Sequence, residues 1–121
     1  MRDHTKLRAF ELADQIAVMV YEKTRQFPKD EVFGLTSQMR RAAMSIPSNI
    51  VEGCARESQA EYVRFLNIAF GSLKELHYQF SIADRLGYLK DVNKSEFENK
   101  FTEIEKVLGG LIRSMRPSKT E

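Results

Sequence analysis

Apolar side chains that recur alternately three and four residues apart constrain the fold of this chain more than any other feature. The most regular run lies within 59–86 and consists of Tyr62, Leu66, Ala69, Leu73, Leu76, Phe80 and Ala83. This spacing puts all of these side chains on one face of an α-helix and is typical of the seam of a helical bundle. The sequence has no strand-like alternation of apolar and polar residues. We therefore expect an all-α protein.

Three further segments have helical periodicity and are separated by stop signals. Pro28 disfavours helix at the residue before it, Ser58 offers an N-cap, and Gly87 can end a helix. The expected helices lie at about 5–26, 34–57, 59–86 and 94–115. Because short connections join antiparallel neighbours, we predict an up-down-up-down four-helix bundle over residues 1–116, followed by a basic flexible tail at 117–121.

Length and composition limit the class of protein. A chain of 121 residues can form one domain, and its 42% hydrophobic and 30% charged residues are typical of a soluble helical protein. No tract approaches the roughly 20 apolar residues that span a bilayer, so we expect no membrane partner. One cysteine cannot form an internal disulfide, and the first eight residues lack the apolar stretch of a signal peptide. These features predict a cytoplasmic protein.

Three of the expected helices have a second apolar ridge away from the predicted core. In the first helix the core side is expected to hold Phe10, Ala13, Ala17, Val20, Tyr21 and Thr24. The second ridges consist of Leu12, Ile16 and Met19, then Met44, Pro47 and Val51, then Ile68, Tyr78 and Ile82. One bundle cannot bury both faces of a helix, so we predict that these residues form an oligomer interface while the fourth helix faces solvent. Pro47 is expected to kink its helix without breaking it.

The basic residues suggest a possible phosphate-binding surface, although 19 basic against 17 acidic residues leave a net charge of only +2. The candidates for contact with nucleic acid are Arg40, Arg41, Arg56, Arg64, Lys74, Arg113 and Arg116. No acidic residue lies between Glu31 and Glu52, so Arg40 and Arg41 have no partner at helical spacing in their own segment. Alternatively, Arg40 or Arg41 pairs with Glu52, Glu57 or Glu75 of the same or a neighbouring subunit.

The C-terminal end has a local excess of positive charge. From Lys106 to Thr120 the chain contains Lys106, Arg113, Arg116 and Lys119 and no acidic residue. Two interpretations remain open at this point. These cations complement the dipole of the last helix and keep the tail soluble, or they contact nucleic acid.

Motifs that carry chemistry are missing from the sequence. It has no Glu-x-x-His pair for a di-iron site, and Cys54, His4 and His77 lack the spacing of a zinc site. Cys54 fits a small buried residue near a helix end, and His77 fits the edge of a core or an interface. Gly109-Gly110 is not followed by the lysine and hydroxyl of a phosphate-binding loop. We therefore expect no catalytic residues, no metal, no cofactor and no enzymatic activity.

Two segments closely resemble a known family. They are F-P-K-D-E-V-F-G-L-T-S-Q-M-R-R-A-A-M-S-I-P-S-N-I-V-E-G at 27–53 and E-Y-V-R-F-L-N-I-A-F-G-S-L-K-E-L at 61–76. They resemble the bacterial four-helix bundle proteins named for reading frames in intervening sequences of 23S rRNA genes. This resemblance implies a protomer that assembles into a ring, usually described as a pentamer, with no established enzymatic activity.

The accessory proteins of diversity-generating retroelements are also similar, and their basic bundle surface binds nucleic acid and a reverse transcriptase. By this analogy we expect a non-enzymatic, homo-oligomeric interaction protein that binds RNA or DNA without sequence preference. The alternative is a protein-binding adaptor or structural assembly that uses its arginines in subunit contacts.

Overall fold

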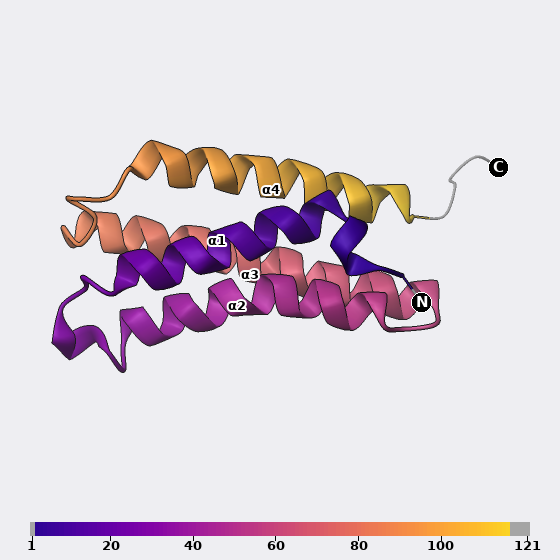
Figure 1. Ribbon diagram of the computed structural model, residues 1–121, viewed down its shortest axis with the longest axis horizontal. Coiled ribbons are helices and arrows are strands. Elements are labelled where there is room, and N and C mark those ends of the chain that lie inside the picture. Colours follow the sequence, from indigo (N-terminus) through magenta and orange to yellow (C-terminus); the bar gives the residue numbers. More distant parts are fainter. Residues whose placement is uncertain (1, 117–121) are drawn as a thin grey trace.

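A computed structural model describes residues 2–116 and confirms an all-α fold with four main helices. These are α1 (Arg8–Thr24), α2 (Leu35–Cys54), α3 (Gln59–Arg85) and α4 (Lys94–Ser114). Two short 3₁₀ turns, η1 (His4–Lys6) and η2 (Lys29–Glu31), precede α1 and α2. Figure 1 shows that consecutive helices run in opposite directions along the long axis. Over the described residues each helix packs against two others, and α2 with α3 forms the most extensive contact.

The helix ends follow the expected capping signals, with small shifts. Ser58 caps α3 by accepting a hydrogen bond from the backbone N–H of Glu61 at 3.1 Å. Asn93 caps α4 in the same way. Gly87 has a φ of +81°, a conformation that favours glycine after a helix end. α1 begins later than expected because Asp3 caps the separate turn η1.

The seam predicted in the third helix is confirmed as part of the core. All of its members, from Tyr62 to Ala83, are buried. Phe80 packs against Phe97 and Phe101 of α4, with ring centroids 5.0 and 5.5 Å apart. Gly53 lets α2 approach α3 closely, because a Cβ at this position would lie 3.0 Å from the Cβ of Phe65. The core therefore extends along the whole bundle.

The orientation predicted for the first helix is partly wrong. Buried as expected are Ala13, Ala17, Val20 and Thr24. Leu12 and Ile16, expected on an outer ridge, are fully buried, whereas Tyr21, expected in the core, is 39% exposed. The physical reason is that α1 contacts both α2 and α4, so its buried face is wide. Leu12 and Ile16 are therefore not available at the surface as interface residues.

The helix α2 continues through Pro47 without a break, as expected. Pro47 itself is buried rather than raised on an outer ridge. None of the helices in the described part of the chain has the length and apolar character needed to cross a bilayer.

Candidate interaction surfaces

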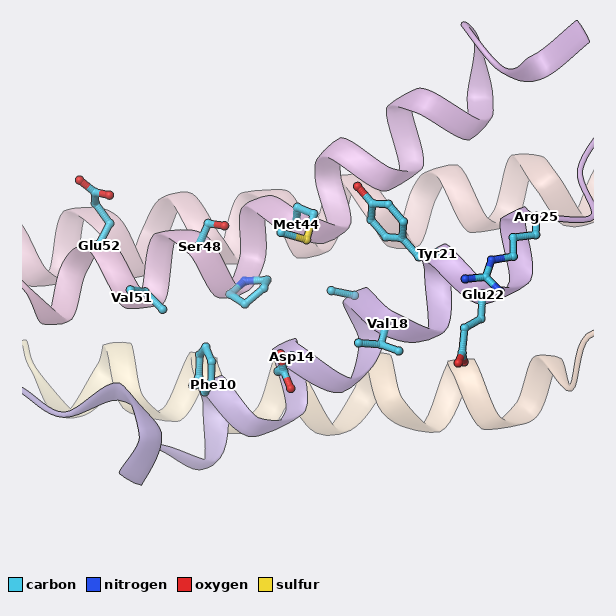
Figure 2. Close-up of a pocket in the computed structure, with 12 residues that line it drawn as sticks. Phe10, Asp14, Val18, Tyr21, Glu22, Arg25, Met44, Ser48, Val51 and Glu52 are labelled. Atoms are coloured by element: carbon cyan, nitrogen blue, oxygen red, sulfur yellow. The ribbon is translucent and has the colours of Figure 1, made fainter. Parts of the chain in front are cut away.

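An apolar groove of about 800 Å³ lies between α1 and α2. Val18 and Tyr21 line it from α1, and Met44 and Val51 line it from α2, with Phe10 at one end (Figure 2). Val18 is 51% exposed, Met44 46% and Val51 37%. Large side chains with this exposure along a single groove are typical of a surface that binds another protein. We call this feature the α1–α2 groove.

Charged residues flank the α1–α2 groove. Asp14, Glu22 and Arg25 come from α1, and Glu52 comes from α2 (Figure 2). Glu52 forms an ion pair with Arg56, in which its Oε1 lies 2.6 Å from Nη2 of the guanidinium. Among the described residues, no ion pair involves Asp14, Glu22 or Arg25. The groove thus has an apolar centre and a rim with three carboxylates and one guanidinium.

The remaining residues of the predicted interface lie elsewhere. Ile68 and Tyr78 of α3 are 40% and 63% exposed, and Ile82 is half-buried on the same side of that helix. Met19 is half-buried against the core and lines a different hollow, between α1 and α4. The predicted residues therefore divide between the α1–α2 groove, the α3 surface, the α1–α4 hollow and the core.

Arg40 is held inside its own subunit, which neither interpretation of the sequence anticipated. Its Nε donates to the hydroxyl of Thr24 at 2.8 Å, and its Nη2 donates to the Tyr21 carbonyl at 3.3 Å. Its guanidinium lies 4.8 Å from the centre of the Tyr21 ring. Arg40 therefore joins α2 to the last turn of α1 and forms no ion pair with a carboxylate of the described residues.

Three more candidate cations have carboxylate partners within the chain. Arg56 pairs with Glu52, Arg64 pairs with Glu61 at 3.2 Å, and Lys74 pairs with Glu105 at 3.3 Å. These pairs are exposed and contribute little to stability, but each carboxylate cancels positive charge at its position. They are weaker candidates for phosphate contact than an unpaired cation.

Arg41, Arg113 and Arg116 have no side-chain ion pair within residues 2–116. Arg41 lines a hollow between α2 and α3 that also contains Glu75. Arg113 lines two adjoining hollows of about 350 and 330 Å³ between α3 and α4. Lys106 and Glu105 line the first of these hollows and Arg116 the second, and Phe70 forms a wall of both. Because Glu105 pairs with Lys74, the cations of the hollow remain in excess. We call these joined hollows the α3–α4 basic hollow.

Cys54 and His77 do not form a catalytic pair. Cys54 is buried at the end of α2, where burial raises the pKa of its thiol and so disfavours the nucleophilic thiolate. His77 lies in the second half of α3, away from the end of α2. Its ring stacks on that of Phe101, with centroids 4.3 Å apart, and its Nε2 is hydrogen-bonded to Glu98 Oε1 at 2.8 Å. In the described residues, no three His, Cys, Asp or Glu side chains gather where they could hold a metal ion.

Sequence reasoning missed Val18 and Tyr21 as surface residues and Phe70 as a wall of the basic hollow. The signal for Val18 and Tyr21 was their position between Asp14 and Arg25, at spacings that keep all of these residues on one helix face. Nothing in the spacing of α3 alone indicated that Phe70 borders cations of α4. That arrangement depends on how α3 packs against α4.

Comparison with known proteins agrees with this architecture. The model of the family described as 23S rRNA-intervening sequence protein matches residues 5–110. A crystal structure of a protein of unknown function from the S23 ribosomal protein family of Bacteroides thetaiotaomicron is 25% identical, with a TM-score of 0.78. The match covers 87% of this chain and 95% of that protein. No curated protein matches the chain. With most of its length matched by the family model, this chain belongs to the 23S rRNA-intervening sequence proteins.

Proposed function

We propose that this chain is a non-enzymatic, homo-oligomeric interaction protein that binds RNA or DNA without sequence preference. The observation that carries the nucleic-acid part is the α3–α4 basic hollow, where Lys106, Arg113 and Arg116 lie without an ion pair in residues 2–116. Cations of this kind neutralise phosphates and release counterions, which gives binding that depends on salt rather than on sequence.

The geometry of the hollow favours contact with the backbone of a nucleic acid rather than a fit to one small molecule. Lys106 and Arg113 are exposed on the second half of α4, and Arg116 is exposed just after that helix. Oligomerisation would repeat the hollow on every subunit, so several weak phosphate contacts would act together. The modest net charge of the whole chain is compatible with this because the cations are clustered.

Filter binding with a single-stranded RNA across a salt series tests the proposal. The wild type is expected to retain RNA at low salt, with log affinity falling linearly with log salt. Each lost phosphate contact lowers the steepness of the plot of log affinity against log salt by about 0.7 for a single strand. Replacing both Arg113 and Arg116 by glutamine should therefore lower it by about 1.4 for each chain that contacts the RNA. Arg56→Gln is the matched control, because Arg56 already pairs with Glu52. No retention of RNA at low salt would end the nucleic-acid proposal.

The second candidate function is a protein-binding adaptor or a purely structural assembly, and the α1–α2 groove favours it. Sedimentation of the wild type over a range of concentrations tests self-association directly. Arg41 separates the two candidates, because its side chain has no ion pair within the described subunit. Arg41→Ala should dissociate the assembly if Arg41 serves subunit contacts, and should only weaken RNA binding if it serves phosphate.

A further inference from the structure

The α1–α2 groove and the exposed face of α3 have matching patterns of charge and shape. Along α1, the groove side presents Asp14, Val18, Tyr21 and Arg25, at spacings of four, three and four residues. Along α3, one outward stripe presents Glu75, Tyr78, Ile82 and Arg85, at spacings of three, four and three. Each set lies on one face of its helix.

Placed antiparallel, the two stripes are complementary at every position. Asp14 then faces Arg85, Val18 faces Ile82, Tyr21 faces Tyr78, and Arg25 faces Glu75. The lengths also agree, because at 1.5 Å per residue the α1 stripe spans about 16 Å and the α3 stripe about 15 Å. Opposite charges at both ends would fix the direction and register of such a contact.

The four end charges are not used for ion pairs inside the subunit. Among residues 2–116, no ion pair involves Asp14, Arg25, Glu75 or Arg85. Glu75 only accepts a 3.4 Å hydrogen bond from Gln79, and Arg85 only donates one of 3.4 Å to the Ser81 carbonyl. Their charges are therefore available to a second molecule.

We propose that the α1–α2 groove of one subunit receives the Glu75–Arg85 face of α3 from a second copy, in this antiparallel register. The inference rests on the self-association proposed above and identifies the two surfaces that form it. Such a contact is heterologous, since different surfaces of the two copies meet, and it can therefore continue from subunit to subunit.

The charges also allow each stripe to pair with a copy of itself, and shape argues against both arrangements. Two α3 stripes could meet antiparallel, with Glu75 facing Arg85 in both directions, but two projecting faces would then meet and both α1–α2 grooves would stay uncovered. Two α1 stripes could also meet antiparallel, with Asp14 facing Arg25 in both directions. That arrangement would place two concave grooves opposite each other, with nothing to fill the space of about 800 Å³ in each. A projecting helix face with Tyr78, 63% exposed, fills a groove by normal ridge-into-groove packing.

Charge reversal tests the register. Arg25→Glu and Glu75→Arg should each weaken self-association about tenfold, because each brings like charges together, and the double variant should restore it. Lys90→Glu, which makes the same change of charge at an exposed site in the α3–α4 connection, is the matched control and should have no effect. If Asp14→Arg rather than Glu75→Arg rescues Arg25→Glu, the α1–α1 pairing is correct and our inference is wrong.

A mixing experiment tests the heterologous geometry. Val18→Glu blocks the groove and Tyr78→Glu blocks the stripe, so each variant alone should sediment as one chain of 14.0 kDa. Mixed in equal amounts, they should form a dimer of twice that mass, because one variant keeps an intact stripe and the other an intact groove. Circular dichroism of each variant establishes that both remain helical.

The outcomes separate this inference from the broader proposal. A wild type that sediments as a single chain at all concentrations removes self-association itself. A wild type that assembles while the mixture stays monomeric and the charge reversals have no effect leaves self-association intact, but removes the groove-and-stripe contact.

Discussion

Replacing Ile16 by alanine should destabilise the single subunit strongly, although sequence periodicity placed Ile16 on an outer ridge. Ile16 is fully buried, and alanine lacks three of its carbon atoms. At about 0.8 kcal/mol for each buried CH₂, the lost transfer free energy is about 2.4 kcal/mol, and the cavity brings the expected loss to about 3–4 kcal/mol. For a domain of this size, that loss lowers the melting temperature by roughly 10–15 °C.

Val18→Ala is the matched variant, because Val18 lies two residues away on the same helix and is 51% exposed. The small loss of burial is offset by the better helix propensity of alanine, so the free energy of unfolding should change by less than about 0.5 kcal/mol. Its effect should appear in self-association, since Val18 lines the α1–α2 groove. The two variants therefore separate a core residue from a surface residue of α1.

Urea unfolding at two protein concentrations measures both effects. The loss for Ile16→Ala should be the same at both concentrations, because it arises within one subunit. A loss below about 1 kcal/mol, or one seen only at the concentration at which the wild type assembles, would show that Ile16 belongs to an interface and that our account of α1 is wrong.

Three other predictions follow from close contacts in the structure. Gly53→Ala should destabilise the subunit by about 1–2 kcal/mol in urea unfolding, because its Cβ would press on α3, whereas Gly71→Ala, with nothing within 4 Å, should stabilise it by up to about 1 kcal/mol. Arg40→Ala should cost about 1–2 kcal/mol through its lost hydrogen bonds to α1 and leave retention of RNA unchanged. The backbone N–H of Leu35, and then the Tyr88 hydroxyl, lower the pKa of Glu31 below its ordinary value of 4.5, so the stability that Glu31 provides is present above that pH and is lost as pH falls through the lowered pKa. Thermal melts from pH 6 to pH 3 should therefore show a shallower acid loss for Glu31→Gln than for the wild type.

The seam of α3 shows what the sequence could predict. Its residues from Tyr62 to Ala83 follow one period over seven positions, whereas the ridge on the opposite side has only Ile68, Tyr78 and Ile82. This spacing therefore predicted both the helix and its buried face, and the capping residue Ser58 predicted where the helix begins. Strong periodicity with a clear cap determines an element locally, before any neighbour is known.

The same reasoning was only partly right for α1, because the apolar residues of this helix cover a wide arc. Ala9, Leu12, Ile16 and Val20 all face the interior, where α1 meets α2 on one side and α4 on the other. Periodicity shows that a helix is amphipathic, but it cannot choose between two adjacent apolar stripes. The choice depends on which neighbours the helix packs against.

The partner of Arg40 could not be predicted from the sequence either. The spacing within α2 shows only that Arg40 has no carboxylate within reach on its own helix. Its side chain instead donates to the hydroxyl of Thr24, sixteen positions earlier in the chain. Thr24 is buried and donates its own hydroxyl to the Val20 carbonyl, which leaves its oxygen free to accept from Arg40. Such a contact depends on the antiparallel alignment of α1 and α2, and residue types alone do not specify it.

The two proposed surfaces use different residues, and this leads to a last prediction. The near end of the proposed stripe is Glu75, whereas Asn67 borders the basic hollow, about 12 Å away along α3 at 1.5 Å per residue. Arg113 and Arg116 lie on α4 and just after it, outside the stripe, so we expect assembly through the stripe to leave them uncovered and to add their charges with each subunit.

The monomeric variant Tyr78→Glu should accordingly bind a long single-stranded RNA with a much smaller salt slope than the wild type, because only one basic hollow contacts each RNA at a time. Filter binding at matched chain concentrations measures the difference, and a short RNA that spans one subunit should abolish it. Equal slopes on the long RNA would show that the hollows act singly, and that self-association does not strengthen nucleic-acid binding.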